Sequence, residues 1–250
     1  MEYIILNSII FLYGIVIGSF LNVCIYRIPA KESTITRRSH CMCCGNVLKW
    51  YELIPLFSYL FQRGKCRHCQ SRISIQYPLV ECTNAIFYVL VFNVKGFTPE
   101  SIIYCLCAST LLVITLIDWR TYEIPLSCNV MIGLLGIIHG VLDRENWLQY
   151  VVGFFTVSGL FYIIYIITKG RGIGGGDIKL MAAAGLLLGW QNVLLALVIG
   201  SVAGSIIHVS LMKLKGKDRV LAFGPYLSAG IFIAMLYGDQ IIKWYLSLYL

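Results

Sequence analysis

Long apolar runs constrain the fold of this chain more than any other feature. A helix needs about 20 mostly apolar residues to cross the ~30 Å hydrocarbon core of a bilayer. Backbone polar groups in lipid must be satisfied within the protein, and the sequence lacks the alternating strands of about ten residues that a membrane β-barrel requires. The runs therefore predict an all-α polytopic membrane protein. They lie near residues 4–26, 78–94, 100–117, 124–141, 148–168, 192–212 and 222–247.

A further apolar run, 178–190, is shorter. We count it as an eighth transmembrane helix, tilted or partly interfacial, because without it Asp177 and the basic segment 213–219 would lie on opposite sides of the membrane. With about eight crossings, all of the 20 Lys and Arg residues except Lys95, Arg144 and Lys243 lie on one side. Basic loops favour the cytoplasm, so this side is predicted to be cytoplasmic and both termini to lie outside the cytoplasm.

The composition agrees with a membrane protein and bounds its partners. The 250 residues are 58% hydrophobic and 13% charged, with a mean hydropathy of +0.79, whereas soluble domains are usually about 45–50% apolar. The formal net charge of +8 comes from basic residues that mostly flank the apolar runs, where anionic lipid headgroups explain them. We therefore expect membrane lipid as a partner and do not expect nucleic-acid binding.

A polar stretch, residues 27–77, interrupts the apolar pattern and is rich in Cys, Arg and Gly. It predicts a small cytoplasmic domain inserted between the first two transmembrane helices. The predicted regions are thus a first helix (1–26), the inserted domain (27–77) and a larger transmembrane domain (78–250). Glycine pairs spaced four residues apart predict close helix packing within the chain. They are Gly14/Gly18, Gly185/Gly189 and Gly200/Gly204.

The inserted domain contains two C-x-x-C motifs. Their spacing is close to a structural zinc pattern, in which two turns each supply two thiolates to one tetrahedral ion. Cytoplasmic thiols stay reduced and a polar insert of about 50 residues needs a metal to fold, so zinc is favoured over a thiol–disulfide exchange role. A site closed by four thiolates supports structure and does not activate water. The predicted ligands are Cys41, Cys44, Cys66 and Cys69, with Cys43, His40 and His68 near enough in sequence to substitute.

Two aspartates lie at the inner ends of predicted membrane helices: Asp118 ends the third and Asp177 begins the sixth. Carboxylates about 4 Å apart repel by about 4 kcal/mol at an effective dielectric of 20, so such a pair would share one proton. One carboxyl can then act as an acid and the other as a base, as in aspartic proteases. The alternative is that both merely mark the boundary between water and membrane.

Three glycines, Gly174, Gly175 and Gly176, directly precede Asp177. A backbone without side chains lets an extended peptide approach closely. The run therefore fits a peptide-binding segment beside a catalytic carboxyl.

Ordered motifs along nearly the whole chain resemble the type IV prepilin peptidase family, membrane aspartic proteases with a G-x-G-D motif. Two departures from the family pattern are Met42, where proline is usual, and Leu126, where an acidic residue is frequent; neither is a predicted ligand or catalytic carboxyl. The matching segments are Gly18–Val23, Tyr26–Pro29, Ser39–Cys41, Gly64–Cys69, Tyr77–Glu81, Ile117–Asp118, Ile124–Pro125, Gly174–Leu180 and Phe223–Tyr226.

The resemblance implies a bifunctional enzyme of the bacterial inner membrane. Members of the family remove the short basic leader from prepilins and pseudopilins at the cytoplasmic face, and then methylate the new amino terminus with S-adenosylmethionine. Members without the cysteine domain are thought to lack methyl transfer, and this chain retains that domain. The resemblance does not locate the methyl-donor site, name the substrates or fix the oligomeric state.

Three further residues are candidates for supporting roles. Glu81 could hold or deprotonate the substrate's α-amine, or could pair with Arg72 or another loop cation. Asn22 could contact the substrate or bond between helices, and the second use is favoured. Lys179 could stabilise the ionised aspartate pair or extend to lipid phosphate.

Two functions of other classes compete with proteolysis. A proton- or cation-coupled transporter would use the same carboxylates for ion movement along a glycine-broken helix. A zinc-anchored scaffold for secretion or pilus assembly would have no turnover.

Overall fold

The computed structural model describes residues 1–215 and 222–248, and residues 216–219 of the basic segment 213–219 lie outside this range. Over the described residues the chain is helical, with two isolated β-bridges and no strand. Five helices are long and apolar enough to cross a membrane, which confirms a helical membrane protein. The predicted count of about eight spans stays a prediction. The spans are Tyr3–Arg27, Gln76–Lys95, Pro99–Thr121, Arg144–Ile167 and Gly175–Ser210.

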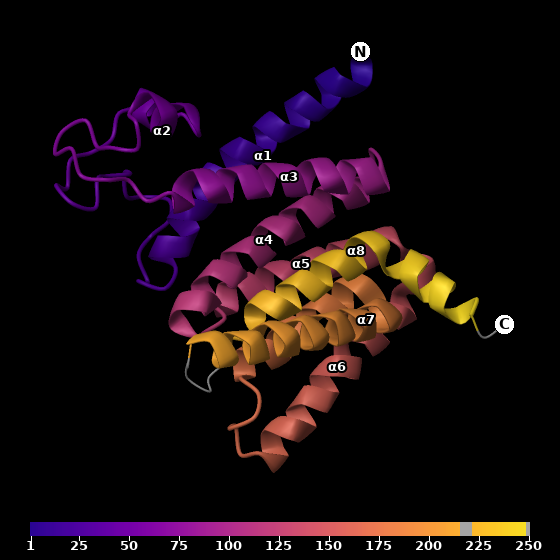
Figure 1. Ribbon diagram of the computed structural model, residues 1–250. Helices are drawn as coiled ribbons and strands as arrows, with labels where there is room; N and C mark the ends of the chain where they lie inside the picture. Colours follow the sequence, from indigo (N-terminus) through magenta and orange to yellow (C-terminus); the bar gives the residue numbers. More distant parts are fainter. Residues whose placement is uncertain (216–221, 249–250) are drawn as a thin grey trace. The chain divides into compact units, whose positions relative to one another are not determined.

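The chain divides into two compact units, Met1–Phe97 and Thr98–Leu250. The first unit contains α1 (Glu2–Arg27), η1 (Trp50–Glu52), α2 (Phe57–Phe61) and α3 (Gln76–Lys95). The second contains α4 (Pro99–Thr121), α5 (Leu126–Leu142), η2 (Arg144–Asn146), α6 (Trp147–Ile167), α7 (Gly175–Lys215) and α8 (Gly224–Leu246). Figure 1 shows these helices and the loop-rich segment that carries α2 between α1 and α3.

In the first unit α1 packs directly on α3. A Cβ added to Gly14 would lie 2.5 Å from Ala85 Cα, and one added to Gly18 would lie 2.7 Å from Glu81 Cα, so only glycine permits this approach. The Asn84 side chain uses the short distance to donate to the Gly14 carbonyl at 2.8 Å. The Gly14/Gly18 pair therefore serves packing within the chain, as its spacing predicts.

In the second unit α7 packs against α5, α6 and α8. Its helical geometry is interrupted at Gly189, where φ is +77°, a conformation that glycine adopts without steric cost. The break lies one residue before the end of the predicted short run 178–190, which is followed by the run 192–212. Gly185 and Gly200 also lie where an added Cβ would meet backbone, of Gly153 and of Tyr226 respectively.

The helix α4 ends where it does for a local reason. Tyr122 follows it in the left-handed conformation and its N–H donates to the Asp118 carbonyl at 2.9 Å, which closes the last turn. The Ile124–Pro125 pair then starts α5 with Pro125 as the N-cap. Because α4 and α7 both have neighbours in α5 and α8, the end of α4 and the start of α7 can share one end of the unit.

Candidate active site and cysteine centre

Asp118 lies in the last turn of α4 and is buried, with 4% of its surface exposed. The Gly224 N–H, at the start of α8, donates to Asp118 Oδ2 at 2.9 Å. A Cβ at Gly224 would lie 2.7 Å from the same oxygen, so the backbone approaches the carboxyl only because residue 224 is glycine. The amino end of a helix also favours a negative charge. Sequence reasoning used Gly224 only as part of a family motif and missed this contact.

Asp177 lies in the first turn of α7 and is half-buried. The Gly174 N–H donates to its Oδ2 at 3.3 Å. The Asp118 carboxyl interacts electrostatically with the Asp177 carboxyl, so the two groups lie within Coulomb range although 58 residues separate them in the chain. The structure thus places the two aspartates in the second unit, near enough for their charges to interact.

The three glycines before Asp177 have different surroundings. None has a positive φ. These positions therefore need glycine for its lack of a side chain and not for its backbone conformation. Gly175 faces open space, whereas a Cβ at Gly176 would lie 3.0 Å from Ile124 Cβ and one at Gly174 would lie 3.1 Å from Asp177 Oδ2. Gly176 therefore needs to be small for the fold, and Gly175 leaves room beside the aspartates.

Asn129, on α5, was not identified from the sequence. Its buried side chain donates to the Gly176 carbonyl at 3.4 Å, one residue before Asp177, while its Oδ1 has no partner among the described residues. It ties α5 to the start of α7. The Lys179 side chain is exposed and forms no ion pair with either aspartate. The structure therefore does not place Lys179 in contact with the carboxyl pair.

The two cysteine motifs of the first unit fold into matching turns. The Cys41 N–H donates to the Asn46 carbonyl at 2.9 Å and the Cys66 N–H donates to the Ser71 carbonyl at 2.9 Å. The fifth residue of each turn, Gly45 or Gln70, has a positive φ of 70° or 58°. Two copies of one turn thus present two pairs of thiols.

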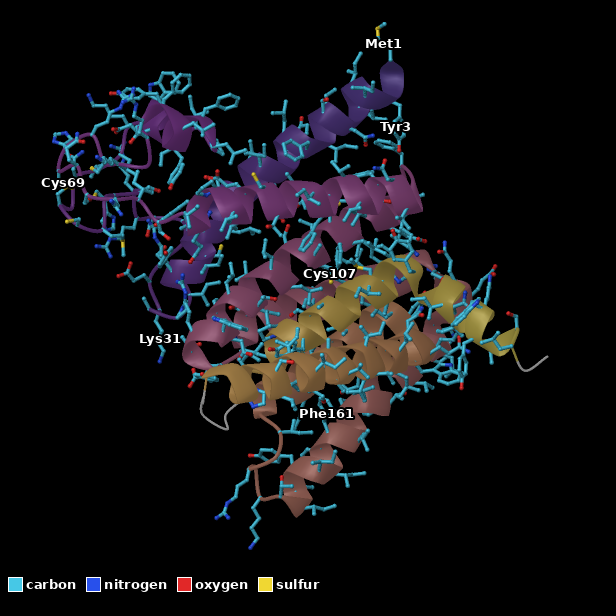
Figure 2. All side chains as sticks on the ribbon, in the orientation of Figure 1. Met1, Tyr3, Lys31, Cys69, Cys107 and Phe161 are labelled. Atoms are coloured by element: carbon cyan, nitrogen blue, oxygen red, sulfur yellow. The ribbon has the colours of Figure 1, made fainter. Side chains whose placement is uncertain are left out.

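The four predicted ligands form one cluster, with their sulfur atoms all within 4.8 Å of one another. A tetrahedral ion with bonds of about 2.3 Å would place sulfur atoms about 3.8 Å apart, and the Sγ atoms of Cys41 and Cys69 lie 3.9 Å apart. The cluster can therefore bind a metal ion. It does not include Cys43, His40 or His68. Figure 2 labels Cys69 in this loop-rich segment.

Hydrogen bonds favour thiolate at two of these cysteines. The Ser71 hydroxyl and backbone lower the pKa of Cys69 to about 6. Backbone N–H groups of the first turn, that of Cys44 foremost, lower the pKa of Cys41. Metal ions bind the thiolate form, so the turns prepare these sulfur atoms for coordination.

Glu81 and Asn22 lie together on the packed faces of α3 and α1. The Leu56 N–H donates to Glu81 Oε2 at 2.8 Å and the Ser19 hydroxyl bonds to the same carboxyl. Glu81 forms no ion pair with Arg72 or any other described cation. The Asn22 side chain donates to the Tyr77 carbonyl at 3.1 Å, which is the predicted bond between helices, yet its buried Oδ1 has no partner among the described residues.

A cavity of about 590 Å³ opens beside these two residues, within the first unit. Its walls come from α1, from the start of α3 and from the loop-rich segment between them. The cavity also borders the cysteine cluster through Cys41 and Cys66. Nothing in the sequence spacing indicated it.

Comparison with known proteins agrees with this division of the chain. Residues 12–94 match the family model described as the bacterial peptidase A24 N-terminal domain, and residues 105–209 match the model of the type IV leader peptidase family. No solved structure matches. Proteins named prepilin leader peptidase/N-methyltransferase are similar over nearly their whole length. That of Aeromonas salmonicida (strain A449) is 31% identical over 96% of this chain and 94% of its own, and that of Bacillus subtilis (strain 168) is 32% identical over 96% and 98%.

The chain belongs to the type IV leader peptidase family. The two matched regions of this family member fall within the two structural units, Met1–Phe97 and Thr98–Leu250. The cysteine cluster, the cavity and Glu81 lie in the first, and both aspartates lie in the second. The two candidate sites of the leader peptidase are therefore carried by different units.

Proposed function

We propose that this protein is an aspartic endopeptidase of the bacterial inner membrane that removes the leader peptide from prepilins and pseudopilins and then N-methylates the new amino terminus. Asp118 and Asp177 are the catalytic residues of cleavage. The observation that carries this assignment is that two helix ends, each with a backbone N–H on one carboxylate oxygen, bring these carboxyls within Coulomb range in one unit. Membership of a leader peptidase family supports it.

Cleavage needs one ionised and one protonated carboxyl. The ionised carboxylate takes a proton from water as the water oxygen bonds to the scissile carbonyl carbon, and the protonated partner donates to the carbonyl oxygen. The carbon–nitrogen bond then breaks and the leaving amine takes a proton from the pair. The Gly224 and Gly174 N–H groups hold Oδ2 of each aspartate, and we assign the contacts with water and substrate to the Oδ1 atoms. The open space at Gly175 suits an extended peptide.

Methyl transfer requires an unprotonated amine. An α-amino group has a pKa of about 7.7–8.0 and is mostly protonated near neutrality. We propose that Glu81 holds this amine and accepts its proton, because its carboxyl is buried, has neutral donors only, and lines the cavity. S-adenosylmethionine, when bound, supplies the methyl group.

The cysteine cluster is proposed to hold zinc as a structural ion. Four thiolates leave no open coordination position, so the ion would hold the two matching turns together and not activate water. The cluster, the aspartate pair and the basic loops are proposed to lie on the cytoplasmic side with both termini outside, following the distribution of Lys and Arg.

The assignment of the aspartates is tested with purified protein and a synthetic prepilin. We expect Asp118→Asn and Asp177→Asn each to lower the cleavage rate by about 10²–10⁴-fold, the contribution typical of acid–base groups, measured by intact mass. Asp239→Asn is the matched control, because Asp239 is exposed and accepts a hydrogen bond from Asn192 away from the pair. Cleavage at the wild-type rate in either site variant would overturn the assignment.

A further inference from the structure

The cavity of the first unit has the size and the chemistry of a small-molecule site. Binding sites for small molecules usually enclose about 300–1,000 Å³, and this cavity measures about 590 Å³. One wall is a continuous face of α1, with Ser19, Asn22 and Tyr26 at helical spacing, and Tyr77 and Glu81 face it from one side of α3. The remaining walls belong to the loop-rich segment.

Two hydrogen-bond acceptors mark the polar part of this cavity. Asn22 Oδ1 is buried without a partner, in a residue that is 1% exposed. A buried acceptor without a donor costs about 1–3 kcal/mol, so such an atom indicates a missing partner. The Glu81 carboxyl, 5% exposed, receives hydrogen bonds only from neutral groups. Together these acceptors fit a ligand with a positive charge and N–H donors.

Two other features of the cavity specify the rest of the ligand. The rings of Tyr26 and Tyr77 are stacked, with centroids 5.8 Å apart and planes 20° from parallel. Such a pair offers a flat surface to a heterocycle and a π-face to a cation. Arg72 lines the same cavity and has no ion-pair partner in the described chain, so it is available to a carboxylate.

We infer that this cavity is the binding site for S-adenosylmethionine, a molecule that combines a cationic sulfonium, an amino-acid end and a flat purine. Asn22 and Glu81 receive its positive end, and Tyr26 and Tyr77 contact the purine. The inference rests on the proposed methyltransferase function and adds the site, which neither the sequence nor the family resemblance locates.

The atoms and protons of methyl transfer at this site balance when Glu81 is the proton acceptor. The substrate's amine nitrogen bonds to the methyl carbon while the carbon–sulfur bond breaks and its electron pair stays on sulfur. The proton that Glu81 takes leaves the α-ammonium group before this attack, and the product is a methylated ammonium that keeps its remaining protons. Because Glu81 lines the proposed donor cavity, one carboxylate can contact both the methyl donor and the substrate's amine.

The test measures binding of S-adenosylmethionine to the full-length protein in detergent by isothermal titration calorimetry, without prepilin. We expect one site per chain in the wild type. Asn22→Leu and Glu81→Gln should each weaken binding at least about tenfold, since each removes a buried acceptor for a charged ligand. Both variants should retain leader cleavage, because the aspartates lie in the other unit.

Two matched controls separate ligand contact from helix packing. Asn84→Leu removes a hydrogen bond between α1 and α3 of the same kind as that of Asn22, but Asn84 does not line the cavity. Glu145→Gln removes an exposed carboxylate of the second unit. Both should bind the donor as the wild type does. Equal weakening in Asn22→Leu and Asn84→Leu would overturn the inference.

Photo-crosslinking provides a readout that needs no variant. Ultraviolet irradiation of wild-type protein with radiolabelled S-adenosylmethionine, followed by peptide mapping, should label peptides that contain Tyr26 or Tyr77. Label confined to residues 98–250, or no binding by a wild-type protein that cleaves prepilin, would contradict the site while leaving the peptidase assignment intact. Failure to cleave prepilin would instead contradict the proposed function.

Discussion

The two units of this protein build their sites in opposite ways. In the second unit, backbone N–H groups of glycines hold the oxygens of two carboxyls that stand at helix ends. In the first unit, side chains of two helices and of the loop segment that carries the cysteine cluster surround a cavity. The proposed peptidase site therefore depends on how closely the helices approach, whereas the cavity depends on whether the loop segment is folded.

Loss of the metal should have the largest effect and should fall on the first unit. Cys66→Ser removes a buried ligand, and a polar segment of this size lacks the apolar core to stay folded without its ion. We expect the variant to lose bound zinc, measured by mass spectrometry of the metal, and to lose measurable binding of S-adenosylmethionine. The matched control is Cys82→Ser, which lies outside both the cluster and the cavity. Normal binding of S-adenosylmethionine by zinc-free protein would show that the cavity does not depend on the metal.

A change at Gly224 should break only the second unit's site. The added Cβ of Gly224→Ala would lie 2.7 Å from Asp118 Oδ2, so the carboxyl or α8 must shift. A displacement of about 1 Å in a catalytic group costs about 100-fold in rate, and we expect that loss in kcat/KM for cleavage with donor binding unchanged. Gly159→Ala, where the structure leaves open space, should cleave normally. Wild-type cleavage by Gly224→Ala would show that this close approach is unimportant.

Asn129 allows a smaller test of how the second site is positioned. Asn129→Leu removes the bond to the Gly176 carbonyl without touching either aspartate. Loss of one such bond is worth about 1 kcal/mol, so we expect kcat to fall about fivefold to tenfold while KM changes little. A lower melting temperature of Asn129→Leu, together with slower cleavage, would indicate a general packing role.

The smallest structural effect is expected at Gly175. Its neighbourhood is open, so Gly175→Ala should leave the melting temperature unchanged. If an extended peptide occupies that space, KM should rise about threefold or more, because a methyl group would crowd the substrate. Gly176→Ala, against Ile124, should instead lower the melting temperature. An unchanged KM for Gly175→Ala would show that the substrate peptide does not occupy the space beside Gly175.

Sequence reasoning predicted features set by local chemistry. The apolar runs predicted the helices. The spacing of the cysteines predicted the cluster of four sulfur atoms, which lie within 4.8 Å of one another. The interruption of helical geometry at Gly189 lies near the end of the short run 178–190, and the separate crossing of that run stays a prediction. The two aspartates were singled out because charged groups are costly beside hydrocarbon.

Contacts between distant helices were beyond that reasoning. Gly224 and Asp118 are 106 positions apart, and helices that are apolar on all sides carry little information about which face meets which neighbour. The same limit hid Asn129 and the cavity, since both depend on how helices turn and where a loop returns. Only the glycine positions hinted at close approach.

We assign cleavage to the second unit and methyl transfer to the first. The most direct test gives each variant two substrates, an intact prepilin and a pilin whose leader is already removed, with S-adenosylmethionine, and reads both products by intact mass. Asp177→Asn should methylate the processed pilin but leave the prepilin uncut, and Glu81→Gln should cut the prepilin but leave its new amino terminus unmethylated. Loss of both activities in each variant, with the proteins folded, would contradict the separation.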